Sequence, residues 1–154
     1  MLMYRNMTAS DTLNVYALMN ENLDGNFSLD VIEYFLTVWP EGQYVAVDLF
    51  GNIAGALCGT RLENGLANIA LFAVDAKFRG QGVGTNLLDR FKTRCYMSGY
   101  SHIQLELRVT NKNAFRFYQN HGFVLTEEVP SLYGPGEDGL RMVAKLSGVN
   151  HVSS

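Results

Sequence analysis

Residues 66–84, LANIALFAVDAKFRGQGVG, decide the fold of this 154-residue chain. The segment Leu66–Asp75 is a mainly apolar run of strand length, which predicts a buried strand. The residues after position 84 carry apolar side chains at helical spacing, and Gly99 closes the helix that this spacing predicts. The junction between strand and helix therefore contains three glycines: Gly80, Gly82 and Gly84.

This junction has the features of a phosphate-binding loop. Glycine lets backbone N–H groups approach a ligand closely, and a helix N-terminus adds unpaired amides and the positive end of the helix dipole. Lys77 and Arg79 add positive charge beside the glycines. We therefore expect a pyrophosphate-binding loop. A tight turn that needs glycine for its geometry alone is the alternative, which the adjacent basic residues disfavour.

Two common phosphate-binding loops fit the sequence poorly. A Walker loop needs Gly-Lys-Ser/Thr, and no lysine follows any of these glycines. A dinucleotide-binding loop needs a third glycine where Thr85 stands, and its strand should open a βαβ unit. Here the strand follows two strand-like segments, 43–48 and 53–60, that predict a hairpin.

Strands and helices alternate along the rest of the chain. Further strands are expected at residues 2–7, 102–109, 123–129 and 139–146, and further helices after Ser10 or Asp11, at 28–39 and after Asn111. The order predicts an α+β fold around a mixed sheet. We expect a single domain over residues 1–147 and a flexible C-terminal tail over residues 148–154.

Composition excludes several classes of protein. With 47% apolar and 18% charged residues, the chain has the composition of a globular domain. The net charge of −3 argues against nucleic-acid binding, and no apolar stretch reaches the roughly 18 residues of a membrane span. Cys58 and Cys95 make no metal-ligand pattern and suit buried thiols in a reducing compartment, so we expect a cytoplasmic protein without a metal or a disulfide.

Two motifs resemble those of one known family. The pattern Arg79-x-x-Gly82-x-Gly84, after a strand that ends in Phe72-Ala73-Val74, resembles the acetyl-CoA signature of the GCN5-related N-acetyltransferases (GNAT). Residues 105–123, LELRVxNxxAxxFYxxxGF, are similar to the second conserved block of that family. The resemblance implies the GNAT fold, a mostly antiparallel mixed sheet of about six or seven strands flanked by about four helices. It also implies acetyl-CoA as cosubstrate.

The resemblance carries over to particular residues. Cofactor binding is expected at Phe72, Ala73, Val74, Arg79, Gly80, Gln81, Gly82, Val83, Gly84, Asn111 and Tyr118. Residues 132–142, LYGPGEDGLRM, and the segment Asn22-Leu23-Asp24 resemble the protein N-terminal (Nα) acetyltransferases, among them the ribosomal-protein alanine acetyltransferases. Acceptor binding is therefore expected at Leu23, Asp24 and Tyr133.

Other acceptors and partners remain open. Leu132 replaces the first tyrosine of a Tyr-Tyr pair in those enzymes, Gly139 replaces an alanine, and Ala70-Leu71 replaces a Thr-Ser pair. A small-molecule amine of polyamine or aminoglycoside type is the alternative to a protein N-terminus. A non-catalytic CoA-binding module is a third reading, which Tyr118 disfavours. If the acceptor is a protein N-terminus, the partner of the chain is a peptide substrate. An auxiliary subunit or a homodimer is a further option.

The reaction requires a base, an acid and an oxyanion donor. An α-amine has a pKa of about 7.7–8.0 against about 10.4 for lysine, so a modest base suffices for protein N-termini. Glu106, on the polar face of its strand, is expected to be this base; the alternative is a carboxylate that pairs with Arg108, and His102 is the rival base. Tyr118 is expected to protonate the departing thiolate, and the backbone N–H of Val74 or its neighbours to stabilise the oxyanion.

Overall fold

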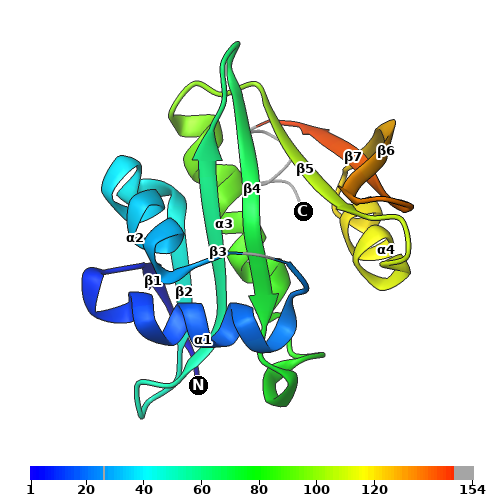
Figure 1. Cartoon of the computed structure of the whole chain (residues 1–154). Helices are drawn as coiled ribbons and strands as arrows, with labels where there is room; N and C mark the ends of the chain where they lie inside the picture. Colours follow the sequence, from blue (N-terminus) through cyan, green and yellow to red (C-terminus); the bar gives the residue numbers. More distant parts are fainter. Residues whose placement is uncertain (26, 148–154) are drawn as a thin grey trace.

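A seven-stranded mixed sheet forms the centre of the computed structural model, which describes residues 1–25 and 27–147 (Figure 1). The strand order is β1-β2-β3-β4-β5-β7-β6, and only the neighbours β4 and β5 run parallel. The strands are β1 (Met3–Asn6), β2 (Gln43–Val47), β3 (Ile53–Arg61), β4 (Leu66–Val74), β5 (His102–Arg108), β6 (Val124–Gly134) and β7 (Glu137–Lys145). The expected mixed, mostly antiparallel sheet is confirmed.

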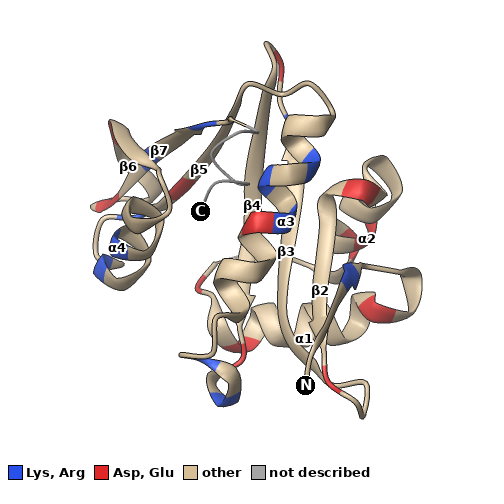
Figure 2. Ribbon diagram, turned by 180° about the vertical axis from the view of Figure 1, so that it is seen from behind, with Lys and Arg blue, Asp and Glu red and all other residues tan. Residues whose placement is uncertain are grey.

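The helices pack on both faces of this sheet. They are α1 (Thr12–Asn22), α2 (Leu29–Val38), α3 (Val83–Met97) and α4 (Lys112–Asn120). One core joins α1 and α2 to β2, β3 and β4, and the other joins α3 and α4 to β2, β3, β4, β5 and β7. Figure 2 shows α3 lying across the sheet on the side away from α1 and α2. On the side of α1 and α2, the part of the sheet made by β5, β7 and β6 has no helix over it in Figure 1.

Of the two expected caps, Asp11 is the N-cap residue of α1, although its side chain makes no capping hydrogen bond to that helix. Residues Ala9–Asp11 form a short 3-10 turn, so Ser10 lies inside the helical segment and does not cap it. The side chain of Asp11 points toward the preceding residues. Its carboxylate accepts a hydrogen bond from the Thr8 backbone N–H at 2.8 Å and pairs with Arg5 at 2.7 Å. Helix α2 begins as expected, with the Ser28 hydroxyl accepting from the Val31 N–H.

The predicted single domain over residues 1–147 stays a prediction, and the predicted tail over residues 148–154 lies outside the described residues. Within the described part of the chain, no helix combines the length and the apolar character that crossing a membrane requires. Cys58 and Cys95 are both buried and free, so neither forms a disulfide.

Candidate active site

The site begins where β4 and β5 separate. The two strands pair from Leu66 with His102 as far as Ile69 with Leu105, and the pairing ends there. On the other side of β4 the register with β3 shifts at the same place, because Cys58 pairs with Leu71 while Gly59 pairs with Ile69. Such a bulge bends and twists a strand. The last residues of β4 therefore turn away from β5 with one backbone edge unpaired along the gap.

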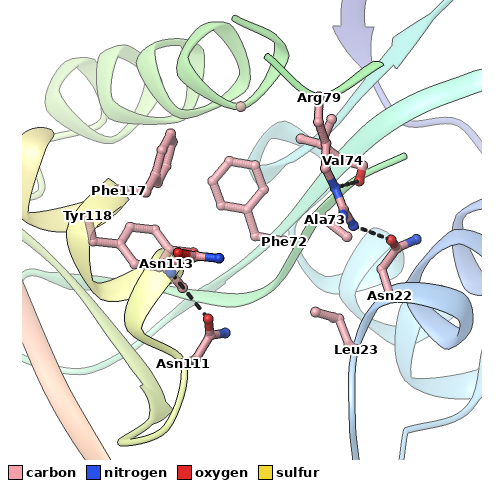
Figure 3. A pocket seen from close by; sticks show the side chains of 12 residues that line it. Asn22, Leu23, Phe72, Ala73, Val74, Arg79, Asn111, Asn113, Phe117 and Tyr118 are labelled. Carbon is pink, nitrogen blue, oxygen red and sulfur yellow. Dashed lines mark hydrogen bonds between the residues drawn. The ribbon is translucent and has the colours of Figure 1, made fainter. Parts of the chain in front are cut away.

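A cavity of about 440 Å³ lies in this gap (Figure 3). It is lined by Asn22, Leu23, Phe72, Ala73, Val74, Arg79, Gly84, Asn111, Asn113, Ala114, Phe117 and Tyr118. These residues come from the end of α1, the end of β4, the loop before α3, the first turn of α3, and α4. The structure therefore brings together both sequence motifs and one of the two segments expected to bind the acceptor.

The glycine loop forms the N-terminal end of α3. Gly80 and Gly82 both have a φ of +78°, a backbone conformation that glycine adopts without strain. Gly82 caps the helix without a side-chain hydrogen bond, so the first amides of α3 are left to donate to a ligand. Of the expected loop residues, Arg79 and Gly84 line the cavity, while the side chain of Val83 is buried in the core. Val83 can therefore serve a ligand only through its backbone.

Helix α4 is fixed against the first turn of α3. A Cβ at Gly84 would lie 3.3 Å from Cζ of Phe117, so only glycine permits this approach without displacing the ring. Thr85 and His121 form a hydrogen bond of 3.0 Å, and the rings of His121 and Phe117 stack with centroids 4.3 Å apart. These contacts hold the two motifs in one rigid arrangement.

Tyr118 lies in an aromatic cluster at the inner side of the cavity. Its ring packs against Phe72, Phe117 and Phe123, with centroids 5.4 to 6.3 Å apart. Burial raises the pKa of the Tyr118 hydroxyl far above its ordinary value, and nearby Tyr133 adds to the rise. The hydroxyl therefore keeps its proton throughout the neutral pH range and can donate it.

Polar side chains surround the rest of the cavity. Asn111 caps α4 by accepting a hydrogen bond from the Ala114 N–H at 3.2 Å, as expected, and also lines the cavity. The Arg79 guanidinium donates to the Val74 carbonyl at 3.2 Å and to Oδ1 of Asn22 at 2.6 Å. Arg79 thus connects the glycine loop to the end of α1, next to Leu23.

Four lining residues were absent from the expected site. Ala114 and Phe117 stood in the second motif and Asn22 in the segment that resembles an acceptor-binding loop, so the sequence carried a signal for these three. Asn113 carried none, because it matches no fixed position of the motif. Its place on the cavity follows from the direction in which α4 leaves Asn111.

Glu106 follows Leu105 on β5 and is not among the residues that line the cavity. Its carboxylate is paired, but not with the Arg108 that the alternative reading named. Arg141 of β7 donates to its Oε2 from Nη2 at 2.6 Å, whereas Arg108 pairs with Glu137 at 2.5 Å. The reason is the register, which sets Arg141 directly opposite Glu106. Directly opposed side chains on neighbouring strands lie closer than residues two apart on one strand.

Tyr133 covers Arg108 near Glu106. The Arg108 guanidinium lies 4.6 Å from the centroid of the Tyr133 ring. Burial raises the pKa of Tyr133, the Glu106 charge raises it further, and Arg108 opposes the rise. Tyr133 therefore lies close to both Tyr118 and Glu106. Among the other residues expected to bind the acceptor, Leu23 lines the cavity while Asp24 is exposed and does not line it.

Two sequence departures from the resembled family contact each other. A Cβ at Gly139 would lie 2.5 Å from Cδ2 of Leu132 and 3.1 Å from Cε2 of Tyr133. The glycine thus makes room for Leu132 and for the placement of Tyr133.

His102 lies at the wrong end of β5 for catalysis. It pairs with Leu66 at the start of β4, whereas the cavity is lined by the end of β4. Its Nδ1 bonds to the Ser101 hydroxyl at 2.8 Å. The rival base is therefore remote from the site. Within residues 1–25 and 27–147, no three His, Cys, Asp or Glu side chains are grouped so that they could hold a metal ion.

Comparisons with known proteins agree with this geometry. Residues 12–123 match the family described as the acetyltransferase (GNAT) family. The chain is similar to N-alpha-acetyltransferase 30 of Schizosaccharomyces pombe, with 31% identity over 137 residues, 84% of this chain and 89% of that protein. Ard1 from Thermoplasma volcanium has a similar structure, with a TM-score of 0.89 and 30% identity over 95% of this chain and 98% of that one.

A human relative is longer. N-alpha-acetyltransferase 30 of Homo sapiens is 28% identical over 132 residues, which cover 84% of this chain and 36% of the human protein. This chain therefore spans about a third of the length of that relative. Together, these findings confirm the fold and the family that the two motifs indicated.

Proposed function

Because this chain belongs to the acetyltransferase (GNAT) family, we propose that it transfers an acetyl group from acetyl-CoA to the α-amino group of protein N-termini. The observation that carries the proposal is the cavity between β4 and α4, which has free helix amides at its entrance and a protonated tyrosine inside. The similarity to two proteins with Nα-acetyltransferase names supports the choice of acceptor.

The cavity suits an extended thioester cofactor. The amides at the start of α3 and the Arg79 side chain supply donors for the pyrophosphate. The unpaired edge of β4 at Phe72–Val74 supplies backbone groups for the arm that leads to the sulfur. Asn111 adds a side-chain amide on the opposite wall. The thioester would then lie between β4 and Tyr118.

The transfer needs two protons to move. The amine nitrogen attacks the thioester carbon, and a backbone N–H at the end of β4, such as that of Val74, stabilises the oxyanion that forms. Glu106 accepts the proton that the amine loses, directly or through water. The C–S bond breaks, and Tyr118 donates its hydroxyl proton to the thiolate. Tyr118 holds this proton at neutral pH, and burial, which raises its pKa, also makes it a weaker acid than free tyrosine.

The acceptor is expected to enter between the end of α1 and the β6–β7 hairpin. Leu23 lies on the first side and Tyr133 on the second, with Glu106 nearby. A peptide can offer its backbone groups to both sides while the pocket selects its first side chains. Asp24 is retained as an acceptor contact because it follows Leu23 directly.

An acetylation assay with a diverse library of N-terminal peptides tests this proposal. Spermidine and free lysine are assayed beside the peptides at the same acetyl-CoA concentration. We expect at least one peptide to have a higher kcat/KM than either amine. If spermidine or the lysine side chain is faster than every peptide, the small-amine alternative replaces this proposal.

The pH dependence of Glu106→Gln tests the base. An α-amine is partly neutral near pH 8 without help, because its pKa is about 7.7–8.0. The substitution should therefore lower the rate most at low pH and be partly rescued as the pH rises toward about 9. The acetylation rates of the wild-type and variant enzymes, measured at a series of pH values from low pH upward, give the effect. An equal loss at every pH would contradict this role.

We further propose a cytoplasmic location and a peptide or protein partner. The two buried, free thiols suit a reducing compartment. An auxiliary subunit and a homodimer remain the two options for assembly, and size-exclusion chromatography with light scattering of the purified chain distinguishes a homodimer from a monomer.

A further inference from the structure

We propose that Arg141 positions the Glu106 carboxylate for proton transfer, and that Glu127 in turn holds Arg141. The inference rests on the proposed acetyl transfer, in which Glu106 is the base. Arg141 is a positioning residue, because it acts through Glu106 and does not contact the reacting atoms.

The register places these three residues in a row across three strands. β7 lies between β5 and β6, and Arg141 is the partner of Glu106 on one side and of Glu127 on the other. Leu105 and Met142, the neighbours of Glu106 and Arg141 along the strands, belong to the core beneath α3. Because side chains alternate along a strand, the row lies on the opposite face, the one without a covering helix.

The hydrogen bonds fix the Glu106 carboxylate from one side. Arg141 donates from Nε at 3.1 Å and from Nη2 at 2.6 Å, and both donors reach Oε2. Its third donor, Nη1, reaches Oε1 of Glu127 at 2.6 Å. The guanidinium is planar, so fixing it at both ends also fixes the plane in which it meets Glu106. Because both Arg141 donors reach Oε2, Oε1 of Glu106 is the oxygen that accepts the proton from the amine.

Stability alone does not account for this row. The side chains of Glu106, Arg141 and Glu127 retain 31%, 29% and 55% of their exposure. Ion pairs as exposed as these contribute about 0–1 kcal/mol to folding. The orientation of a base has a larger effect, because a displacement of about 1 Å at a reacting group costs up to about 100-fold in rate.

A double-mutant cycle tests the inference. Arg141→Gln alone should lower kcat for a peptide by about 10- to 100-fold and leave the KM for acetyl-CoA unchanged. In a Glu106→Gln background the same substitution should change kcat by less than about twofold, because its target is already absent. Arg141→Lys keeps the charge without the fork of donors, so its kcat should fall between those of Arg141→Gln and wild type.

Lys145→Gln is the matched control. Lys145 lies on the same strand and the same face as Arg141 but opposite His102, so its loss removes an equal charge away from Glu106. Its kcat should equal that of the wild type. Thermal stabilisation of each variant by acetyl-CoA shows that the cofactor site is folded.

Three results would overturn the inference. Equal losses from Arg141→Gln in both backgrounds would show a structural role, and no loss in the wild-type background would show no role. An unchanged kcat in Glu106→Gln would remove the base through which Arg141 acts. The proposed function fails separately, when the wild-type enzyme acetylates no peptide.

Discussion

The cavity beside β4 and the open face of β5, β7 and β6 are neighbours that are built in different ways. The cavity is formed by backbone amides, aromatic rings and glycines at fixed positions, with Gly84 packed against Phe117. The open face is held by ion pairs between exposed side chains, Arg108 with Glu137 and Arg141 with two glutamates. Tyr133 connects the two, since it lies near both Tyr118 and Glu106.

This difference separates the cofactor side from the acceptor side. The packing of backbone and aromatic rings fixes the shape of the cavity. A fixed shape suits the cofactor, because the cofactor is the same in every turnover. Exposed ion pairs contribute little to stability, so the side chains that form them can change without loss of the fold. We therefore expect substitutions on the cofactor side to affect every acceptor equally, and those on the open face to affect acceptors differently.

The largest effect is expected for Tyr118→Phe. The change keeps the ring in its aromatic cluster and removes only the hydroxyl proton. Turnover should fall by about 10²–10⁴-fold while the affinity for acetyl-CoA changes little. The loss should be the same for a peptide and for spermidine, as steady-state kinetics with both acceptors will show. Unchanged turnover would reduce Tyr118 to a packing residue.

Gly82→Val should abolish thermal stabilisation by CoA. A valine at a φ of +78° is strained, and its side chain would stand where the first amides of α3 meet the ligand. At a ligand concentration of about 100 times Kd, the lost stabilisation is about 2.7 kcal/mol. Gly51→Val is the control, because Gly51 has a φ of +84° in the β2–β3 turn, away from the cavity. A full CoA-induced rise in Tm for Gly82→Val would show that the loop is not the phosphate site.

A smaller effect is expected for Asn22→Ala, which removes the hydrogen bond between the glycine loop and the end of α1. Loss of the 2.6 Å hydrogen bond from Arg79 frees the end of α1 next to Leu23. The KM for a peptide should rise about fivefold, equivalent to about 1 kcal/mol, with little change in the Kd for acetyl-CoA. Asn20→Ala, at an exposed position of the same helix, should leave both constants unchanged. A rise confined to the Kd for acetyl-CoA would assign Asn22 to the cofactor side.

The smallest effect is expected for Glu137→Gln, which breaks the ion pair with Arg108 on the open face. Because Glu137 is exposed, the free energy of unfolding should fall by less than about 1 kcal/mol. Stabilisation by CoA should be unchanged, whereas KM should shift for some peptides and not for others. Chemical denaturation and peptide kinetics measure these quantities. A uniform loss for all acceptors would contradict the division between the two sides.

The same division explains how much the sequence could predict. The strands, the helices, the glycine loop and the Asn111 cap depend on neighbours along the chain, and local patterns therefore predicted them. The partner of Glu106 depends on how β5 and β7 align, and Arg141 lies 35 residues away. The sequence suggested Arg108, the nearest arginine on the same face, because the register between distant strands leaves no local signal.

The residues lining the cavity show the same limit. Asn22 and Asn113 line one cavity only because α1 ends and α4 begins at the same gap, which the bulge in β4 opens. Ser10 illustrates a local error, since the backbone N–H of Thr8 bonds to Asp11 and starts the helical segment earlier. Side chains that compete for the same amide are difficult to rank from sequence alone.

We propose that this site acetylates the α-amine of a peptide. The most direct test lets two amines of one peptide compete for the acetyl group. The peptide carries both a free N-terminus and an internal lysine, and it is incubated with acetyl-CoA and the purified chain. Fragmentation mass spectrometry of the singly acetylated product identifies the modified nitrogen. We predict that the acetyl group is on the α-amino nitrogen. An acetyl group found mainly on the lysine side chain would contradict the account.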